Sequence, residues 1–587
     1  MSFGRSRACL AGALAAFLLM PAAAGAQSLG QNSAGGDASG IAGAGGSSTT
    51  GADAGATGKS GKRAGHGGKK GTRRIEVSPY IEVDQIVTAE LTPGDDVLTW
   101  TQLAAGVDVG IEGRNNALSA SVRYQKQIGW GRATNGDVIS GVARGYTTIA
   151  PGLTLEAGAL ATQTSTGSDG RALSGGLVSA KSRTNIYSVY GGPSYKTRAG
   201  DIDLSADYRA GYTKVDQPNA FVATPGAAAT DIFNHSVTQV ADLEAGVAPY
   251  VVAPVGLGVG GSFYQEDVSN LDQRVRDAQA RGLVTVPVSR TVQMVGALGY
   301  EDVQVSSRDV LRDADGNPVI DSNGRYKTDK SQPRELAYDV SGLIWDVAVM
   351  WRPSPRTSLT AHFGRRYGGT AYGGTLAWAP NDRNSVNLVV YNTLSGFGGQ
   401  LNRAIDQLPD DFEAVRDPVT GDLRGCVSSV DGGSCLSGTL GSVRSAVFRA
   451  RGFAASWSHR IGHIDSGIGF GYDNRRFIAR QDSVLAAADG VIDENWWVVA
   501  YLSGRLGREA GWSASAYANW LSSNDALTGD VNGYGISASY YRMLARRLRA
   551  TLALSLDGAN RGGAGRDDAL IDDYWTASAL AGLRYSF

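Results

Sequence analysis

The sequence predicts an all-β fold: a transmembrane, antiparallel, up-and-down β-barrel of about 22 strands, within a range of roughly 18 to 24. Three observations predict it: an export signal at the N-terminus, period-two alternation from position 75 onward, and a final strand that ends on an aromatic residue. The 587-residue chain divides accordingly into a signal peptide (1–26), a Gly-rich segment (27–74) and the barrel (75–587).

The first 26 residues have the pattern of a secretory signal peptide. Arg5 and Arg7 precede an apolar stretch from Ala8 to Met20, and Ala24-Gly25-Ala26 supplies the small residues of a cleavage site. Beyond it, no run approaches the ~20 apolar residues that a membrane helix needs. The mature chain is therefore expected either to be soluble outside the inner membrane or to cross the outer membrane with strands.

Residues 27–74 are rich in Gly, Ala, Ser and Thr and end in a basic cluster between Lys59 and Arg74. Such a segment buries too little apolar surface to offset its chain entropy, so it is expected to be a disordered periplasmic tail. The basic cluster is either a solvated end or a docking site for an acidic polymer or anionic lipid. The formal net charge of −1 argues against a nucleic-acid partner.

From Ile75 onward, apolar and polar residues alternate in segments of about ten residues, as in strands that face lipid and lumen by turns. In the segment 117–130, one face is mainly apolar and the other carries Ser119, Ser121 and Arg123. In the segment 512–520, tryptophans sit at both ends of the apolar face, where interfacial girdles would lie. A soluble sandwich also alternates, but rarely over some five hundred residues.

The last strand places Leu583, Tyr585 and Phe587 on one face and Arg584 on the other, and the chain stops on the phenylalanine. This pattern resembles the terminal signal by which outer-membrane proteins are recognised by the barrel-insertion machinery. Together with the signal peptide, it predicts a location in the outer membrane of a Gram-negative bacterium, with membrane lipid and that machinery as partners.

Short and long connections alternate along the chain. The short turns PVSRTV (287–292), PSPRTSL (353–359) and PNDRNSV (380–386) resemble one another, and their prolines suit positions between strands. Long polar segments lie at 164–182, 216–235, 306–335, 395–443 and 480–494. Short periplasmic turns and long outer loops are typical of bacterial barrels, and they give an even strand number.

Cys426 and Cys435, joined by a Gly-rich segment in an exported chain, are expected to form one small disulfide loop. No GxSxG or HExxH motif is present, and Gly58-Lys59-Ser60 lacks the rest of a phosphate-binding loop. The segment 313–325 could ligate calcium, but its DG and NG pairs favour a loop hairpin. We therefore expect no catalytic residue, cofactor or metal, and no enzyme.

Charged residues on the predicted inner faces are the remaining candidates for a functional site. The candidate lumen residues are Arg123, Arg366, Arg449, Arg451, Asp465, Asp473, Arg549 and Arg584. They either line a water-filled pathway or pair with one another and brace the wall. A register slip of one residue would invert every assignment.

The segments 75–91 (IEVSPYIEVDQIVTAEL), 122–132 (VRYQKQIGWGR) and 351–369 (WRPSPRTSLTAHFGRRYGG) resemble proteobacterial outer-membrane β-barrel proteins of the exosortase/PEP-CTERM-associated and exopolysaccharide-cluster type. The resemblance covers much of residues 75–400. It implies a role in envelope or exopolysaccharide export, with exopolysaccharide or periplasmic secretion components as partners, and it carries over no catalytic residue.

Two functional hypotheses follow. The first is a conduit for exopolysaccharide or its oligomers; the N-terminal segment is too short and too poor in apolar residues to be a folded plug. The second is a barrel closed by its own loops that binds secretion partners or surface polymer, and a general diffusion porin is a further alternative.

Overall fold

The computed structural model describes residues 74–587, except for position 93 and the segments 167–171, 174–182, 217–233, 322–324, 409–411, 422, 429–433, 436–439, 441–442, 444–445, 525–529 and 563–572. The predicted signal peptide and nearly all of the predicted periplasmic tail therefore lie outside the described residues.

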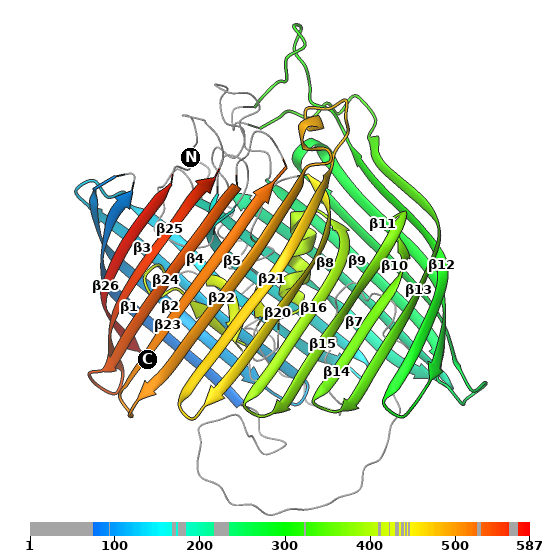
Figure 1. Ribbon diagram of the computed structural model, residues 1–587, viewed down its shortest axis with the longest axis horizontal. Coiled ribbons are helices and arrows are strands. Elements are labelled where there is room, and N and C mark those ends of the chain that lie inside the picture. Colours follow the sequence, from blue (N-terminus) through cyan, green and yellow to red (C-terminus); the bar gives the residue numbers. More distant parts are fainter. Residues whose placement is uncertain are drawn as a thin grey trace, which may run out of the picture.

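The described chain forms a closed barrel of 22 antiparallel strands, which confirms the predicted fold class (Figure 1). Each strand pairs with the next along the chain, and β26 pairs with β1 to close the ring. The wall strands are β1 Arg74–Thr92, β2 Val97–Glu112, β3 Asn116–Trp130, β4 Gly136–Ala150, β5 Leu153–Thr166, β7 Arg183–Ala199, β8 Ile202–Asp216, β9 His235–Val247, β10 Gly256–Val268, β11 Gln273–Pro287, β12 Val292–Ser307, β13 Glu335–Ser354, β14 Thr357–Arg366, β15 Gly369–Asn381, β16 Asn384–Ser395, β20 Val447–Ile461, β21 Ile464–Ile478, β22 Ile492–Leu506, β23 Ala510–Ser523, β24 Asp530–Met543, β25 Leu548–Gly562 and β26 Tyr574–Ser586.

The outer face of this wall is apolar. Alternate large side chains are exposed on strand after strand, for example Ile81 and Val83 on β1 and Leu552 and Leu554 on β25. A closed sheet leaves no unpaired edge, and an apolar outer surface removes the cost of contact with lipid tails. The chain is thus an integral outer-membrane β-barrel.

Leu583, Tyr585 and Phe587 lie on this outer face, as the alternation predicted. Their strand, β26, pairs with β1 from Tyr80↔Ser586 to Thr92↔Trp575, and the backbone N–H of Phe587 donates to the carbonyl of Pro79 at 3.0 Å. The C-terminal strand is therefore part of the closing seam. Its role as an insertion signal stays a prediction.

The predicted short turns gather at one end of the barrel, together with the C-terminus (Figure 1). This end faces the periplasm in bacterial barrels. The longer connections leave the opposite end, where β6 (Ala172–Leu173), η1 (Asn270–Asp272) and η2 (Ala486–Ala488) belong to them. No helix in the described part of the chain is long and apolar enough to cross a membrane.

One long connection enters the barrel instead of staying outside. The segment 396–446, between β16 and β20, is named here the inward loop; it contains α2 (Phe397–Asp406), β17 (Glu413–Arg416), β18 (Leu423–Ser428) and β19 (Ser434–Cys435). Phe397, Leu401 and Ile405 of α2 are buried in a cluster with Leu160 and Ile186 of the inner wall. This apolar cluster inside the lumen is the largest in the described structure.

Candidate functional site: the lumen and its inward loop

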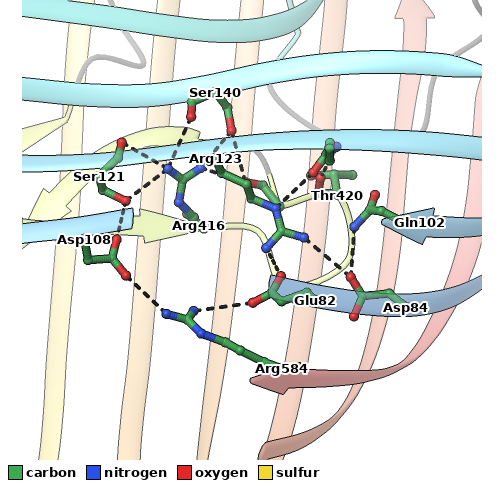
Figure 2. Close-up of polar contacts among 12 residues, drawn as sticks. Glu82, Asp84, Gln102, Asp108, Ser121, Arg123, Ser140, Arg416, Thr420 and Arg584 are labelled. Carbon is green, nitrogen blue, oxygen red and sulfur yellow. Dashed lines mark hydrogen bonds and ion pairs between the residues drawn. The ribbon is translucent and has the colours of Figure 1, made fainter. Parts of the chain in front are cut away.

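The inner face of the wall places Arg123 at the centre of a buried polar network (Figure 2). Its guanidinium donates to the carboxylate of Glu82 and lies 3.5 Å from that of Asp84, which also accepts from Gln102 at 3.1 Å. The Arg584 guanidinium joins the network through Glu82 at 3.4 Å. Because Val83 and Tyr124 on either side face outward, these charges face the lumen.

Arg584 has two further partners, Asp108 at 3.2 Å and the ring of Tyr80, whose centre is 3.5 Å from the guanidinium carbon. Arg549 also lies on the inner face, over the ring of Tyr541 at 5.2 Å. Arginines and carboxylates in this part of the wall thus pair within the wall and brace it.

The inward loop docks on this network through the turn between β17 and β18. Arg416 donates to the hydroxyl groups of Ser140 at 2.7 Å and Ser121 at 3.0 Å (Figure 2). Gln125 donates to the carbonyl of Thr420 at 2.8 Å. The turn itself is closed by the carboxylate of Asp417, which accepts from the backbone N–H of Thr420 at 2.7 Å. A side chain to backbone bond of this kind is the local reason for the turn.

The N-terminus of α2 is held by a carboxylate of the wall. Glu266 of β10 accepts from the backbone N–H groups of Gly396 at 2.6 Å and Gly399 at 3.1 Å. These N–H groups have no partner within the helix, and a negative charge at this end is favoured by the helix dipole. The helix approaches the wall closely: a Cβ atom on Gly398 would lie 1.9 Å from the hydroxyl oxygen of Ser236.

Polar side chains hold the rest of α2. Asn402 accepts from Ser188 at 2.7 Å and donates to Thr238 at 2.8 Å. At the C-terminal end, Arg209 lies 3.1 Å from the carboxylate of Asp406. Burial raises the pKa of the Asp406 carboxyl group, although the positive charge of Arg209 opposes the rise. The helix is therefore fixed at both ends as well as along its apolar face.

A second network lies on the inner face of β11, β12 and β14. Arg366 lies 2.6 Å from Asp277 and 3.5 Å from Glu301. Glu301 also accepts from the backbone N–H of Tyr367 at 2.7 Å. Arg366 therefore faces the lumen, as predicted by the alternation, and forms ion pairs with carboxylates of the wall.

Arg449 and Arg451 are not placed as predicted. They share the face of β20 that carries Phe453 and the exposed Trp457 lower down, which is the outer face. The Arg449 guanidinium nevertheless lies over the ring of Tyr367, at 5.3 Å, above the short β14–β15 hairpin.

The contact between Arg449 and Tyr367 follows from packing at the upper end of the wall. Leu394 of β16 and Val447 of β20 belong to one buried cluster with Val275, Val303 and Val305, which lie on the inner face of β11 and β12. The upper ends of β16 and β20 thus pack against the inner face of the neighbouring wall. Alternation does not separate lipid from lumen at this level.

Asp473 faces the lumen, where it pairs with Arg475 at 2.5 Å and accepts from Tyr391 at 2.6 Å. Asp465 has the same parity but lies at the short-turn end, half exposed, and pairs with Arg460 across the β20–β21 turn at 2.5 Å. Asp465 thus lies at the periplasmic rim of the barrel.

Cys426 of β18 and Cys435 of β19 are direct partners in the antiparallel register. Opposite Cα atoms in such a pair are about 4.5–5.5 Å apart, a separation that a disulfide spans. Their side chains lie outside the described part, so the disulfide stays a prediction. Around the segment 313–325, of which 322–324 lie outside the described residues, a tight hairpin is closed by the bridge Arg312↔Pro318, and a second bridge joins Ile320 to Tyr326. No cluster of metal ligands occurs among the described residues.

Sequence reasoning missed the inward loop and the wall residues that hold it, such as Glu266 and Arg209. One signal was available: Phe397, Leu401 and Ile405 repeat at every fourth position within a segment interpreted as polar loop. That spacing is typical of an amphipathic helix with an apolar stripe to bury. The sequence carries no signal for Glu266, because the backbone N–H groups that it binds come close to it only in the folded barrel.

No family model and no curated protein matches the chain. Solved structures with a similar fold include the FrpB iron transporter of Neisseria meningitidis, F5-1 variant (11% identity, 87% of this chain and 81% of that chain, TM-score 0.39). They also include the ferric-catecholate import receptor Fiu of Escherichia coli K12 in its closed form (9%, 86% and 81%, 0.41) and the outer-membrane protein OmpT of Vibrio cholerae (9%, 87% and 98%, 0.25). The assignment as an outer-membrane barrel depends on the closed wall and its apolar outer face.

Proposed function

We propose that the protein is an outer-membrane conduit whose lumen is narrowed by the inward loop, and that its cargo is an exopolysaccharide or its oligomers. The observation that carries the proposal is the combination of a wide barrel, a polar inner wall and a loop that crosses the space inside. Barrels of 16–18 strands already enclose an aqueous channel, so 22 strands leave room for a loop and a pathway beside it.

The crossing follows from the order of the strands. The loop leaves the wall at β16, and Arg416 reaches Ser140 of β4. In the ring of 22 strands, β4 lies eleven strands from β16 in either direction. The loop therefore reaches the part of the wall that is farthest along the ring from its own strand, and its contacts with β10, β8, β5 and β4 narrow the space left for a solute.

Single-channel recording in planar bilayers tests this proposal. β16 and β20 are paired up to Ser395↔Phe448, so replacing residues 397–446 with a short Asn-Gly turn leaves the wall intact. We expect a small conductance for the full chain and a severalfold larger one for the shortened chain. As a control, residues 311–327 of an outer loop, whose described residues are mostly exposed, are replaced with the same turn, and the conductance is expected to stay unchanged.

The alternative is a closed structural barrel that binds secretion partners or surface polymer. The anchoring of the inward loop at α2 and at Arg416 favours it, because a loop fixed to the wall at two separate places, β10 and β4, resists movement. Under this alternative the full chain is silent in the bilayer and only the shortened chain conducts. A general diffusion porin, in contrast, would pass neutral oligosaccharides into liposomes according to size alone.

A further inference from the structure

The short-turn end of the barrel carries an uneven distribution of charge. Six successive turns join β11–β12, β13–β14, β15–β16, β20–β21, β22–β23 and β24–β25, and five of them follow one another along the lower edge of the wall that faces the viewer in Figure 1. Every one of the six contains an arginine. One representative from each turn is Arg290, Arg356, Arg383, Arg460, Arg508 and Arg547.

The two halves of this rim differ in net charge. The six turns, taken as residues 287–292, 352–357, 379–384, 459–465, 505–510 and 542–548, contain ten arginines against Asp382, Asp465 and Glu509, an excess of seven positive charges. The other four turns, residues 112–116, 149–153, 196–203 and 247–256, contain three basic and three acidic residues. The ten arginines of the first half are named here the basic arc.

Most of the basic arc is available to a ligand. All ten arginines are exposed, and only two of them, Arg356 and Arg460, form an ion pair with a carboxylate of the described chain. By comparison, arginines farther up the inner wall are paired and little exposed: Arg123 is buried and the Arg366 side chain is 14% exposed. Exposed, unpaired guanidinium groups attract anions and bind carboxylate or phosphate with two parallel hydrogen bonds.

The position of the arginines on one side of the rim indicates which kind of anion they bind. Lipid headgroups surround a barrel on all sides, so arginines that served only to anchor it would be needed in all ten turns. Successive turns are separated by two strands, about 10 Å or more along the rim. A row of positive charges at this spacing suits a long chain with regularly spaced negative charges better than a compact ligand.

We propose that the basic arc binds an anionic polysaccharide, such as a polyuronate, at the periplasmic mouth of the barrel. The inference rests on the proposed conduit function and deepens it, because it makes the cargo an acidic polymer. Binding at the rim raises the local concentration of the chain at the mouth, and the exposure of the site keeps the attraction weak enough for release.

The test measures binding of polygalacturonate to the full chain in nanodiscs of phosphatidylcholine, with neutral dextran of equal length as a second probe. The test variant is Arg383→Ala/Arg508→Ala/Arg547→Ala. The matched control is Arg114→Ala/Lys196→Ala/Arg198→Ala, which removes three exposed positive charges from the other half of the rim. Heat-modifiability on a gel confirms that each variant forms the barrel.

We expect polygalacturonate to bind the full chain and the control equally, the triple variant about tenfold more weakly, and binding to weaken with added salt. Dextran is expected not to bind. Equal binding by the triple variant, or equal binding of dextran, would overturn the proposal. A parallel set of nanodiscs contains phosphatidylglycerol as well. Absence of polygalacturonate binding, together with a preference for phosphatidylglycerol that the triple variant loses, would overturn the proposal in favour of lipid anchoring.

This outcome is separate from that of the conductance experiment. If the barrel binds polygalacturonate but does not conduct, the proposed binding site at the basic arc stands and the proposed conduit function is rejected. If the barrel conducts but does not bind polygalacturonate, the proposed conduit function stands and the proposal of an anionic cargo is rejected.

Discussion

Replacing Glu266 with alanine should loosen the helix of the inward loop from the wall. Glu266 accepts two backbone hydrogen bonds from the N-terminus of α2, at 2.6 and 3.1 Å, and its side chain is buried. Hydrogen bonds to a charged group contribute about 1.5–3 kcal/mol each, and loss of a helix cap costs about 1–2 kcal/mol. Since these effects overlap, we expect a total loss of about 3 kcal/mol, or roughly a hundredfold rise in the undocked population.

The rate of maleimide labelling at position 404 measures this population. Ala404 packs partly against the buried cluster, so a cysteine there reacts when the helix leaves the wall. The experiment uses Ala404→Cys in a background with Cys426→Ser and Cys435→Ser. Glu266→Ala should raise the labelling rate up to about a hundredfold, and Glu266→Gln less, because the amide oxygen still accepts a hydrogen bond. An exposed carboxylate on the wall, Glu335, provides the control as Glu335→Gln.

Gly398→Val is an independent perturbation of the same contact, because its Cβ would meet the Ser236 hydroxyl. It should raise the labelling rate while leaving Glu266 in place. If neither Glu266→Ala nor Gly398→Val changes the rate, the cap and the close approach do not hold the helix. Its apolar side chains, Phe397, Leu401 and Ile405, would then be sufficient.

Three further predictions concern the wall, the cysteines and the C-terminus. Arg123→Ala leaves Glu82 and Asp84 buried without their cation and should lower the free energy of unfolding by about 3 kcal/mol, measured as a lower temperature of barrel unfolding on a gel. The control is Arg132→Ala, in an ion pair whose arginine is 80% exposed, and it should cost about 0.5 kcal/mol or less. Equal shifts of the unfolding temperature would contradict the burial argument. Mass spectrometry of the unreduced protein should show Cys426 linked to Cys435, and free thiols at both would reject the disulfide. Phe587→Ala should reduce the fraction of chain that assembles into the heat-modifiable barrel, with no further change once assembled; normal assembly would contradict the role of the last residue.

The inward loop changes the expected role of the charged residues on the inner wall. Arg123, Arg366 and Arg584 face inward, yet each is paired with carboxylates of the wall. The pathway for solute is thus shaped less by free charges on the wall than by the position of the loop. Control of passage by a docked loop would be sensitive to changes at Glu266 of the wall and at Arg416 of the loop, because these two residues hold the loop at β10 and at β3 and β4.

The sequence by itself determined the wall. Period-two alternation decides which side chains meet lipid, because successive residues of a strand point to opposite faces. That rule placed Arg123, Asp473 and Arg549 on the inner face and Leu583 and Phe587 on the outer face, and the spacing of turns gave the strand number. The rule depends only on local backbone geometry, so it needs no knowledge of the rest of the fold.

The tertiary structure alone decided what fills the space inside the barrel and where the alternation rule fails. Glu266 became a helix cap because the fold brings residues 396–399 to it across more than a hundred positions of sequence. Arg449 shares a face of β20 with the exposed Trp457, yet its guanidinium meets Tyr367, because the upper ends of β16 and β20 pack against the inner face of another part of the wall. Contacts between distant segments carry no period in the sequence, since their geometry exists only after the barrel has closed.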